Sequence, residues 1–251
     1  MIKPAFPTPR PALSACLVSL PMILLTLLIG PMPARGDTLA EAWVSNQAQR
    51  THAIDWAYSF ALRKSAIEAG AMGDSAALDA LAALAHRAPA PWQEAWHAEL
   101  ARTQAQPQRS PERFDLPYLL ADLRRNVQLD ALQHYGVCQA PPWVELWTSR
   151  GVERRHWEPG STTAALFKTL PKDARHRVDH AYLVDPLGVV HRLGVAPWNQ
   201  DILPVSPGSR LVIVPRHSRQ HQRHARQVAE RVAGWLATQL PGDVCEIITW
   251  D

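Results

Sequence analysis

Residues 142–215 constrain the fold more than any other stretch, because they consist of short β-rich runs separated by tight turns. Within them Trp198 and Asn199 lead, after a Pro-Gly turn, into a run at 210–214 that is rich in β-branched residues. Such spacing is typical of strands and hairpins and of no catalytic motif. The stretch therefore indicates a small sheet in a module that binds or assembles.

The first 36 residues have the pattern of a secretory signal peptide. A nearly uncharged apolar run covers residues 13–29, and small residues precede Asp37. This predicts cleavage before Asp37 and secretion out of the cytoplasm. An uncleaved anchor is one alternative, since about 17 apolar residues is the lower limit for spanning a bilayer. A lipoprotein is another, because residues 13–16 resemble a lipobox, although they precede most of the apolar run.

Removal of this segment changes the charge balance. The chain has 26 Lys and Arg against 23 Asp and Glu, and Lys3, Arg10 and Arg35 lie in the first 36 residues, which hold no acid. The mature chain therefore has 23 basic and 23 acidic residues and is formally neutral. The balance gives no support for nucleic acid as a partner.

Cys138 and Cys245 remain after cleavage. In an oxidising compartment we expect them to form one disulfide. Such a bridge contributes about 4–5 kcal/mol in the chain-entropy model, because it closes a loop of about 107 residues. Two unrelated buried thiols are the alternative.

Residues 37–142 are predicted to contain a helical hairpin. Apolar spacing predicts a first helix over 56–70. Ser75 is the candidate N-cap of a second helix, and Pro91 stands at the permitted first turn of a third.

Residues 143–216 are predicted to form a small sheet with one helix on one face. The expected elements are strands at 143–148 and 152–157, a helix at 162–170 with Ser161 as N-cap, a hairpin over 181–193 and a strand at 210–214.

Residues 217–251 are predicted to form an amphipathic helix from Ser218 to 240, followed by a strand over 244–250. Arginines are expected on the solvated side of this helix, and contact with a membrane only if the signal is retained or the helix is exposed. The solvated residues are Arg219, Arg223, Arg226 and Arg231.

Several motifs occur in an order that resembles the GfcC-like capsule biosynthesis family. They are Pro-Gly-Ser at 159–161, Val-Asp-Pro-Leu-Gly at 184–188, Ala-Pro-Trp-Asn at 196–199 and Pro-Gly-Ser-Arg-Leu at 207–211, followed by the amphipathic helix. The resemblance covers about residues 45–240 and is strongest after 155.

The resemblance implies an α+β fold with β-grasp-like domains, an inserted helical hairpin and a C-terminal amphipathic helix. Family members are periplasmic proteins encoded with capsule and exopolysaccharide export machinery, and no enzymatic activity is carried over. The chain lacks a Leu-Pro-Gly opening at its mature N-terminus and a Gly-Asp turn within 126–142. These two absences favour a reduced first β-grasp domain, with a complete domain as the alternative.

The histidines give only weak signals for chemistry. His217, His221 and His224 have a spacing that suits zinc on a helix, but a fourth ligand is missing and a solvated polar face is favoured. His176 and His180 lack the glutamate of the zinc protease motif. The sequence has no nucleophile elbow, P-loop or dinucleotide fingerprint, so we predict no catalytic residue, metal or cofactor.

The ten tryptophans, all in the mature chain, suggest a glycan site. An aromatic face stacks on a sugar ring while polar neighbours bond the hydroxyl groups. Trp147, Trp157 and Trp198 have such neighbours, although burial in the core is the alternative for each. The candidate binding residues are Trp157, Trp198, Asn199 and Arg210.

These observations favour a non-enzymatic periplasmic accessory protein in capsule or exopolysaccharide biosynthesis or export. Its partners would be polysaccharide, the outer-membrane polysaccharide export machinery, or both. One alternative is a periplasmic glycan-modifying enzyme that uses a carboxylate in an inter-domain cleft. Another is a protein tethered to the membrane by its amphipathic helix.

Overall fold

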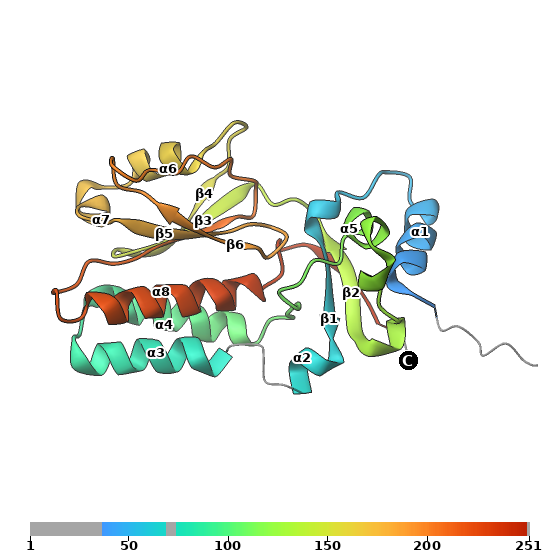
Figure 1. Cartoon of the computed structure of the whole chain (residues 1–251), viewed down its shortest axis with the longest axis horizontal. Helices are drawn as coiled ribbons and strands as arrows, with labels where there is room; N and C mark the ends of the chain where they lie inside the picture. The colour runs from blue at the N-terminus through green and yellow to red at the C-terminus, as the bar shows by residue number, and fades with distance from the viewer. Residues whose placement is uncertain (1–36, 69–73, 250–251) are drawn as a thin grey trace, which may run out of the picture. The chain divides into compact units, whose positions relative to one another are not determined.

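The computed structural model describes residues 37–68 and 74–249, which lie in one compact unit, Gly36–Asp251 (Figure 1). The expected signal peptide at 1–36 lies outside the described residues. Among the residues that are described, no helix has the length and apolar character needed to cross a membrane. The fold is α+β, with helices packed on a five-stranded and a three-stranded sheet.

The five-stranded sheet has the order β4-β3-β7-β5-β6. Its central pair β3 and β7 is parallel, and the other neighbours are antiparallel. All five strands were expected from the sequence. Their bounds are Trp143–Thr148 (β3), Gly151–His156 (β4), His180–Val184 (β5), Val190–Gly194 (β6) and Arg210–Ile213 (β7).

Helices cover both faces of this sheet (Figure 1). Along β7, Leu211 and Ile213 pack toward one face, whereas Val212 packs toward the other, because successive side chains of a strand alternate. A strand buried on both faces is continuously apolar, which explains the β-branched run. The first face carries α6 (Thr163–Thr169) and α7 (Lys172–Arg175); the second carries α3 (Asp74–Arg87), α4 (Pro91–Gln104) and α8 (Gln222–Ala237).

Three expected helix starts differ from the structure by one to four residues. Ser75 lies inside α3 and is not its N-cap. Thr162, not Ser161, caps α6: its Oγ1 accepts a hydrogen bond from the Ala165 N–H at 3.2 Å. Ser218 does not open α8, which begins at Gln222. The Ser218 carbonyl oxygen accepts from the N–H groups of His221 and Gln222 in the turn that leads into the helix.

The three-stranded sheet has the order β1-β2-β8 and is antiparallel throughout. Its strands are Ser59–Arg63 (β1), Leu132–Cys138 (β2) and Cys245–Ile248 (β8). The expected strand over 244–250 is thus observed at its centre. Apolar residues of this sheet pack with α1 (Leu39–Gln49) and α5 (Leu116–Ala121).

The helix expected over 56–70 is wrong. Residues 56–58 form a short 3-10 helix, β1 follows, and α2 covers Lys64–Glu68. The strand forms because Phe60 lies opposite Gly136 of β2. A Cβ atom at Gly136 would lie 2.1 Å from the Glu246 carbonyl oxygen and 2.8 Å from Phe60 Cζ, so glycine is required for this close packing. The remaining short 3-10 helices are Leu123–Arg125 and Leu129–Ala131.

Cys138 and Cys245 face each other across β2 and β8 and form a disulfide with an S–S distance of 2.03 Å. The bridge packs beside Tyr58 and Phe60. It joins two residues that are 107 positions apart in the sequence.

The packing groups cross the segments expected from the sequence. The α3–α4 hairpin, from 37–142, packs on α8 and on the five-stranded sheet formed within 143–216. Within 217–251, α8 belongs to this core, whereas β8 completes the three-stranded sheet. The apolar face of α8 is therefore buried, while Arg219 before it and its Arg223, Arg226 and Arg231 are exposed as expected.

Candidate functional site

Trp198 lies on the loop after β6, and 75 % of its surface is exposed. The loop around it is held by the adjacent amide. Asn199 Oδ1 accepts a hydrogen bond from the Ala196 N–H at 3.0 Å, and Asn199 Nδ2 donates to the Asp179 carbonyl oxygen at 3.1 Å. An exposed indole on a fixed backbone loses little conformational freedom on binding, so it suits a stacking surface.

Gly194 and Asp201 fix the same loop from its other side. Asp201 Oδ2 accepts a hydrogen bond from the Gly194 N–H at 2.7 Å. A Cβ atom at Gly194 would lie 1.8 Å from the Asn199 carbonyl oxygen, so a side chain there would displace the loop. Neither residue was predicted to belong to the site. The available signals in the sequence were a glycine at the end of a predicted strand, Gly194, and a nearby acid, Asp201.

Trp157 and Trp147 are built into the fold. The Trp157 ring is partly buried against the core, and its Nε1 donates to the Val205 carbonyl oxygen at 2.7 Å. Trp147 is fully buried, and its Nε1 donates to Glu145 Oε1 at 2.8 Å. Of the three tryptophans considered from the sequence, Trp198 is the one that the structure presents to solvent.

Arg210 is buried and its guanidinium binds internal partners. Its Nη atoms donate to the carbonyl oxygens of Leu236 at 3.3 Å and Leu240 at 2.8 Å, and its Nε lies 3.6 Å from Glu145 Oε1. Burial lowers the pKa of Arg210. Burial lowers the pKa of Arg109 to about 9. Its Nε donates to the Ala237 carbonyl oxygen at the same end of α8, at 3.0 Å. Both guanidinium groups lie at the carbonyl end of that helix, where a positive charge is favourable. Arg210, which was predicted to bind a ligand, therefore has a supporting role in the fold.

The buried carboxylates are engaged in ion pairs. Glu145 Oε2 accepts from Arg154 Nε at 3.0 Å, and Arg154 also bonds Asp243 at 2.9 Å. Asp115, the other buried acid among the described residues, receives two hydrogen bonds from Arg113, at 2.9 and 3.0 Å. Both carboxylates therefore form charge-assisted hydrogen bonds that support the fold.

The three spaced histidines do not share one helical face. His217 and His221 precede α8, and only His224 lies within it. Their neighbouring ring centroids are 6.3 and 6.4 Å apart. Over residues 37–68 and 74–249, no three His, Cys, Asp or Glu side chains are grouped in a way that would hold a metal ion. Of the other pair, His176 ends α7 and His180 begins β5.

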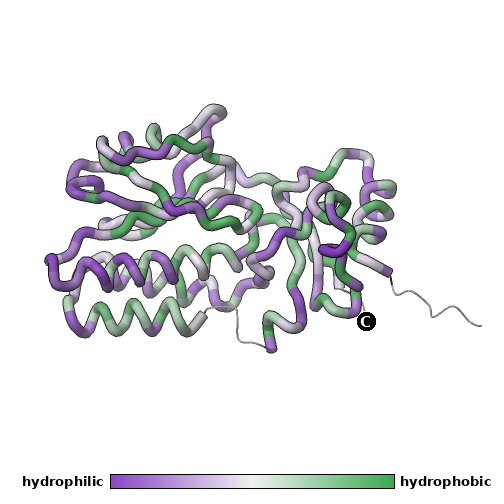
Figure 2. The backbone as a smooth tube through the Cα atoms, viewed as in Figure 1, coloured by the Kyte–Doolittle hydropathy of each residue, from purple (hydrophilic) through white to green (hydrophobic). Residues whose placement is uncertain are grey.

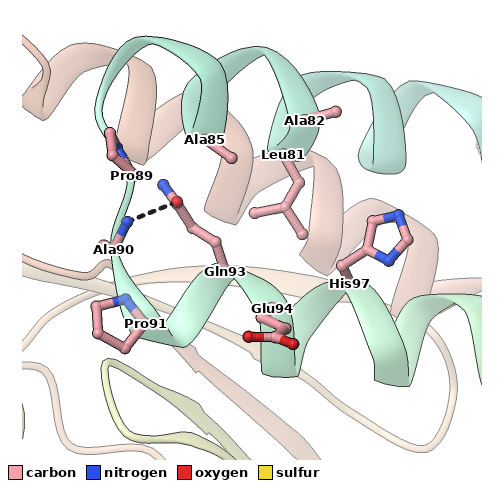
Figure 3. A pocket seen from close by; sticks show the side chains of 9 residues that line it. All are labelled: Leu81, Ala82, Ala85, Pro89, Ala90, Pro91, Gln93, Glu94 and His97. Carbon is pink, nitrogen blue, oxygen red and sulfur yellow. Dashed lines mark hydrogen bonds between the residues drawn. The ribbon is translucent and has the colours of Figure 1, made fainter.

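A hollow of about 650 Å³ lies between α3 and α4 (Figure 3). Its lining is mostly apolar, with Leu81 pointing into it from α3. Gln93 is held by the Ala90 N–H, which donates to its Oε1 at 2.8 Å. Glu94 and His97 supply the charged or titratable groups of this lining. Few polar groups converge here, so the hollow offers little to a glycan.

A second hollow, of about 590 Å³, lies beside α1 and has both acids and amides in its lining. Asp37 and Glu41 are the acids. Glu41 Oε2 accepts hydrogen bonds from the backbone N–H of Thr38 at 2.9 Å and from its hydroxyl at 2.8 Å. This carboxylate therefore forms the capping box of α1.

Comparison of the sequence with models of protein families gives no match, and comparison with curated proteins gives none either.

Proposed function

We propose that this chain is a non-enzymatic accessory protein of capsule or exopolysaccharide biosynthesis or export in the periplasm, of the GfcC-like kind, and that it binds polysaccharide through Trp198. The observation that carries the proposal is the exposed indole on a loop fixed by Asn199, Gly194 and Asp201. The flat apolar faces of sugar rings pack on such a ring. The partner is the polymer, the outer-membrane export machinery, or both.

The topology supports the family part of this proposal. In the five-stranded sheet a hairpin, a helix, a second hairpin and a last strand follow one another, and the last strand inserts beside the first in parallel. A β-grasp domain has this order. The α3–α4 hairpin fits the inserted helical hairpin, and the three-stranded sheet fits a reduced first β-grasp domain.

One further feature supports the proposed compartment. The disulfide between Cys138 and Cys245 fits an oxidising compartment such as the periplasm.

The alternative functions have less support. The buried apolar face of α8 gives a membrane tether no support. The enzyme alternative gains no specific support either, because Glu41 is occupied by its capping box and Glu145 by arginine.

The test is deletion of the gene in its own bacterium, followed by complementation with the full chain or with Trp198→Ala. We expect deletion to change the amount or length of surface polysaccharide, and Trp198→Ala to restore it only weakly. Leu123→Ala is the matched control, since Leu123 is also an exposed apolar residue, 70 % accessible, on a different element. Unchanged polysaccharide after deletion would refute the role in assembly.

The binding step has its own test in affinity electrophoresis of the purified chain through gels that contain the polymer. Trp198→Ala is expected to lose most of the retardation, because a stacked aromatic ring contributes about 1 kcal/mol or more to such a contact. Leu123→Ala is expected to migrate like the unaltered chain. Equal retardation of all three would place the contact elsewhere.

A further inference from the structure

A third hollow, of about 350 Å³, lies where the five-stranded sheet meets the start of α8. Its lining comes from three places in the sequence: residues 177–180 before β5, residues 214–219 after β7, and the first turns of α8. Figure 2 shows a hydrophilic stretch that precedes and opens α8. A cavity of this size is at the small end of the range of about 300–1,000 Å³ for small-molecule sites.

The lining is strongly basic. Arg177, Arg216, Arg219 and Arg226 contribute four guanidinium groups, and Asp179 contributes the single carboxylate among the lining residues. All four arginines are exposed, and none of them forms an ion pair with any residue that the structure describes. Four guanidinium groups against one carboxylate leave an excess of positive charge, which raises the potential of a cleft and attracts anions.

Some arginines elsewhere in the chain are paired with acids. Arg113, Arg154 and Arg155 each lie beside a carboxylate. The four arginines of the hollow differ from these in lining one concave surface together with a single acid.

The backbone around the hollow adds to its preference for anions. The 16-residue helix α8 begins there with no acidic residue in its first turn and no side-chain hydrogen bond from its N-cap His221. Its positive end is thus uncompensated. Arg177 has a φ of 57°, a left-handed conformation that is unfavourable for a residue with a side chain. Such conformations are concentrated at functional sites.

His217 provides a further polar group in the lining. Its Nε2 is buried, while its backbone N–H donates to Gln222 Oε1 at 2.7 Å. Gln222 Nε2 in turn donates to the Pro215 carbonyl oxygen at 3.3 Å. These two hydrogen bonds hold the segment before α8 in place.

We propose that this hollow binds the acidic sugar unit of an anionic saccharide, through a carboxylate or phosphate group on the ring. Arginine suits either group, because its planar fork forms paired hydrogen bonds to two oxygens. The volume accommodates about one or two sugar rings. The inference rests on the proposed function in taking the ligand to be a saccharide, and it adds that the polymer is acidic.

The hollow and the Trp198 loop are joined at one residue. Asp179 lines the hollow, and its carbonyl oxygen accepts the hydrogen bond from Asn199 that holds the loop. An extended saccharide therefore has a charged contact and a stacking contact anchored to the same segment. Neither contact requires a covalent step.

The test is isothermal titration calorimetry of the purified chain with a short oligogalacturonate and with a neutral oligosaccharide of the same length. We expect the acidic oligomer to bind and the neutral one to bind at least tenfold more weakly. The double variant Arg216→Ala/Arg219→Ala should lose at least tenfold in affinity for the acidic oligomer. Both side chains are exposed, so the variant is expected to keep its fold.

The matched control is Arg192→Ala/Arg223→Ala. It removes the same charge from two exposed arginines that do not line the hollow. Affinity within about twofold of the unaltered chain supports the assignment, whereas an equal loss in both double variants would reduce it to a general charge effect and overturn it.

Inorganic phosphate and vesicles of phosphatidylcholine with phosphatidylglycerol form the last two arms. Binding of phosphate as tightly as the oligogalacturonate, or of vesicles in place of the saccharide, would overturn the saccharide assignment. Failure of the anion site is distinguishable from failure of the proposed function. Changed surface polysaccharide after deletion, with no binding of the acidic oligomer, refutes only the site; the reverse pair of results refutes only the role in assembly.

Discussion

The bridge between Cys138 and Cys245 is expected to supply a large part of the stability of the fold. We consider the double variant Cys138→Ala/Cys245→Ala, which leaves no free thiol and places no hydroxyl at the buried Cys138 position. The bridge closes a loop with a sequence separation of 107. In the chain-entropy model such a loop restricts the unfolded chain by about 5 kcal/mol.

This magnitude is comparable with the whole free energy of unfolding of many proteins, which is about 5–15 kcal/mol. The expected loss of about 5 kcal/mol would move the urea midpoint down by about 1.7 M, for a denaturant slope of about 3 kcal/mol/M. The slope itself should rise, because an unfolded chain without the cross-link exposes more surface. The tryptophan fluorescence of the chain reports the transition.

The control is treatment with a reducing agent. Dithiothreitol should lower the midpoint of the unaltered chain to that of the double variant and should leave the variant unchanged. A loss below about 1 kcal/mol with an unchanged slope would refute the reasoning, because it would mean that the β2–β8 pairing confines the unfolded ensemble without the bridge.

Three further predictions concern the loop, the histidines and the basic hollow. Gly194→Ala should lower the free energy of unfolding by about 2–3 kcal/mol and weaken polymer retardation, because the new Cβ would lie 1.8 Å from the Asn199 carbonyl oxygen; an unchanged urea midpoint would contradict this close approach. Burial lowers the pKa of His134 and, together with the neighbouring His221, that of His217 below 6.5, so the unfolded chain binds more protons and stability should fall as the pH drops below 6.5; urea titrations between about pH 7 and pH 5 check this, and His134→Gln should flatten the slope. Arg177→Gly should raise the free energy of unfolding by up to about 1 kcal/mol, and with it the thermal midpoint, since glycine adopts a φ of 57° without strain. The same variant should bind the acidic oligomer more weakly in calorimetry. A lower thermal midpoint would show that the arginine side chain stabilises the loop.

The five-stranded sheet could be predicted from the sequence because its signals are local. Two hairpins are marked by turn residues, including Gly151 and Gly188, which have positive φ values of 113° and 87°. The β-branched run at 210–214 indicated a strand buried on both faces. The parallel pairing of β3 with β7 carries no local signal and follows from the fold as a whole.

The three-stranded sheet shows where local patterns fail. Residues 59–63 have apolar spacing that suits a helix, yet they form β1 because β2 lies opposite, more than 70 positions later in the sequence. Residues 132–138 contain Gly136 and polar residues and gave no strand signal. Glycine is required at position 136 because Phe60 and Glu246 lie beside it in the folded chain, and this cannot be seen from the sequence.

The candidate sites divide in the same way. Trp198 and Asn199 were identifiable because they adjoin each other in a turn, whereas the exposure of Trp198 and burial of Trp147 depend on the packing of the helices. The basic hollow combines arginines from positions 177, 216, 219 and 226. These arginines come together because the end of β7 and the start of β5 lie side by side at one end of the sheet. The helix pattern alone therefore predicted only that Arg219 and Arg226 are solvated.

The placement of β8 has a consequence for the order in which the chain can assemble. A polypeptide emerges from its N-terminus, and Cys245 follows Cys138 by 107 residues. Strand β2 therefore has one unpaired edge until the five-stranded sheet, α8 and finally β8 have been synthesised. An unpaired edge of this kind invites pairing with other chains. Because β8 is the last strand to pair with β2, the newly made protein is most prone to aggregate just before Cys138 and Cys245 are oxidised.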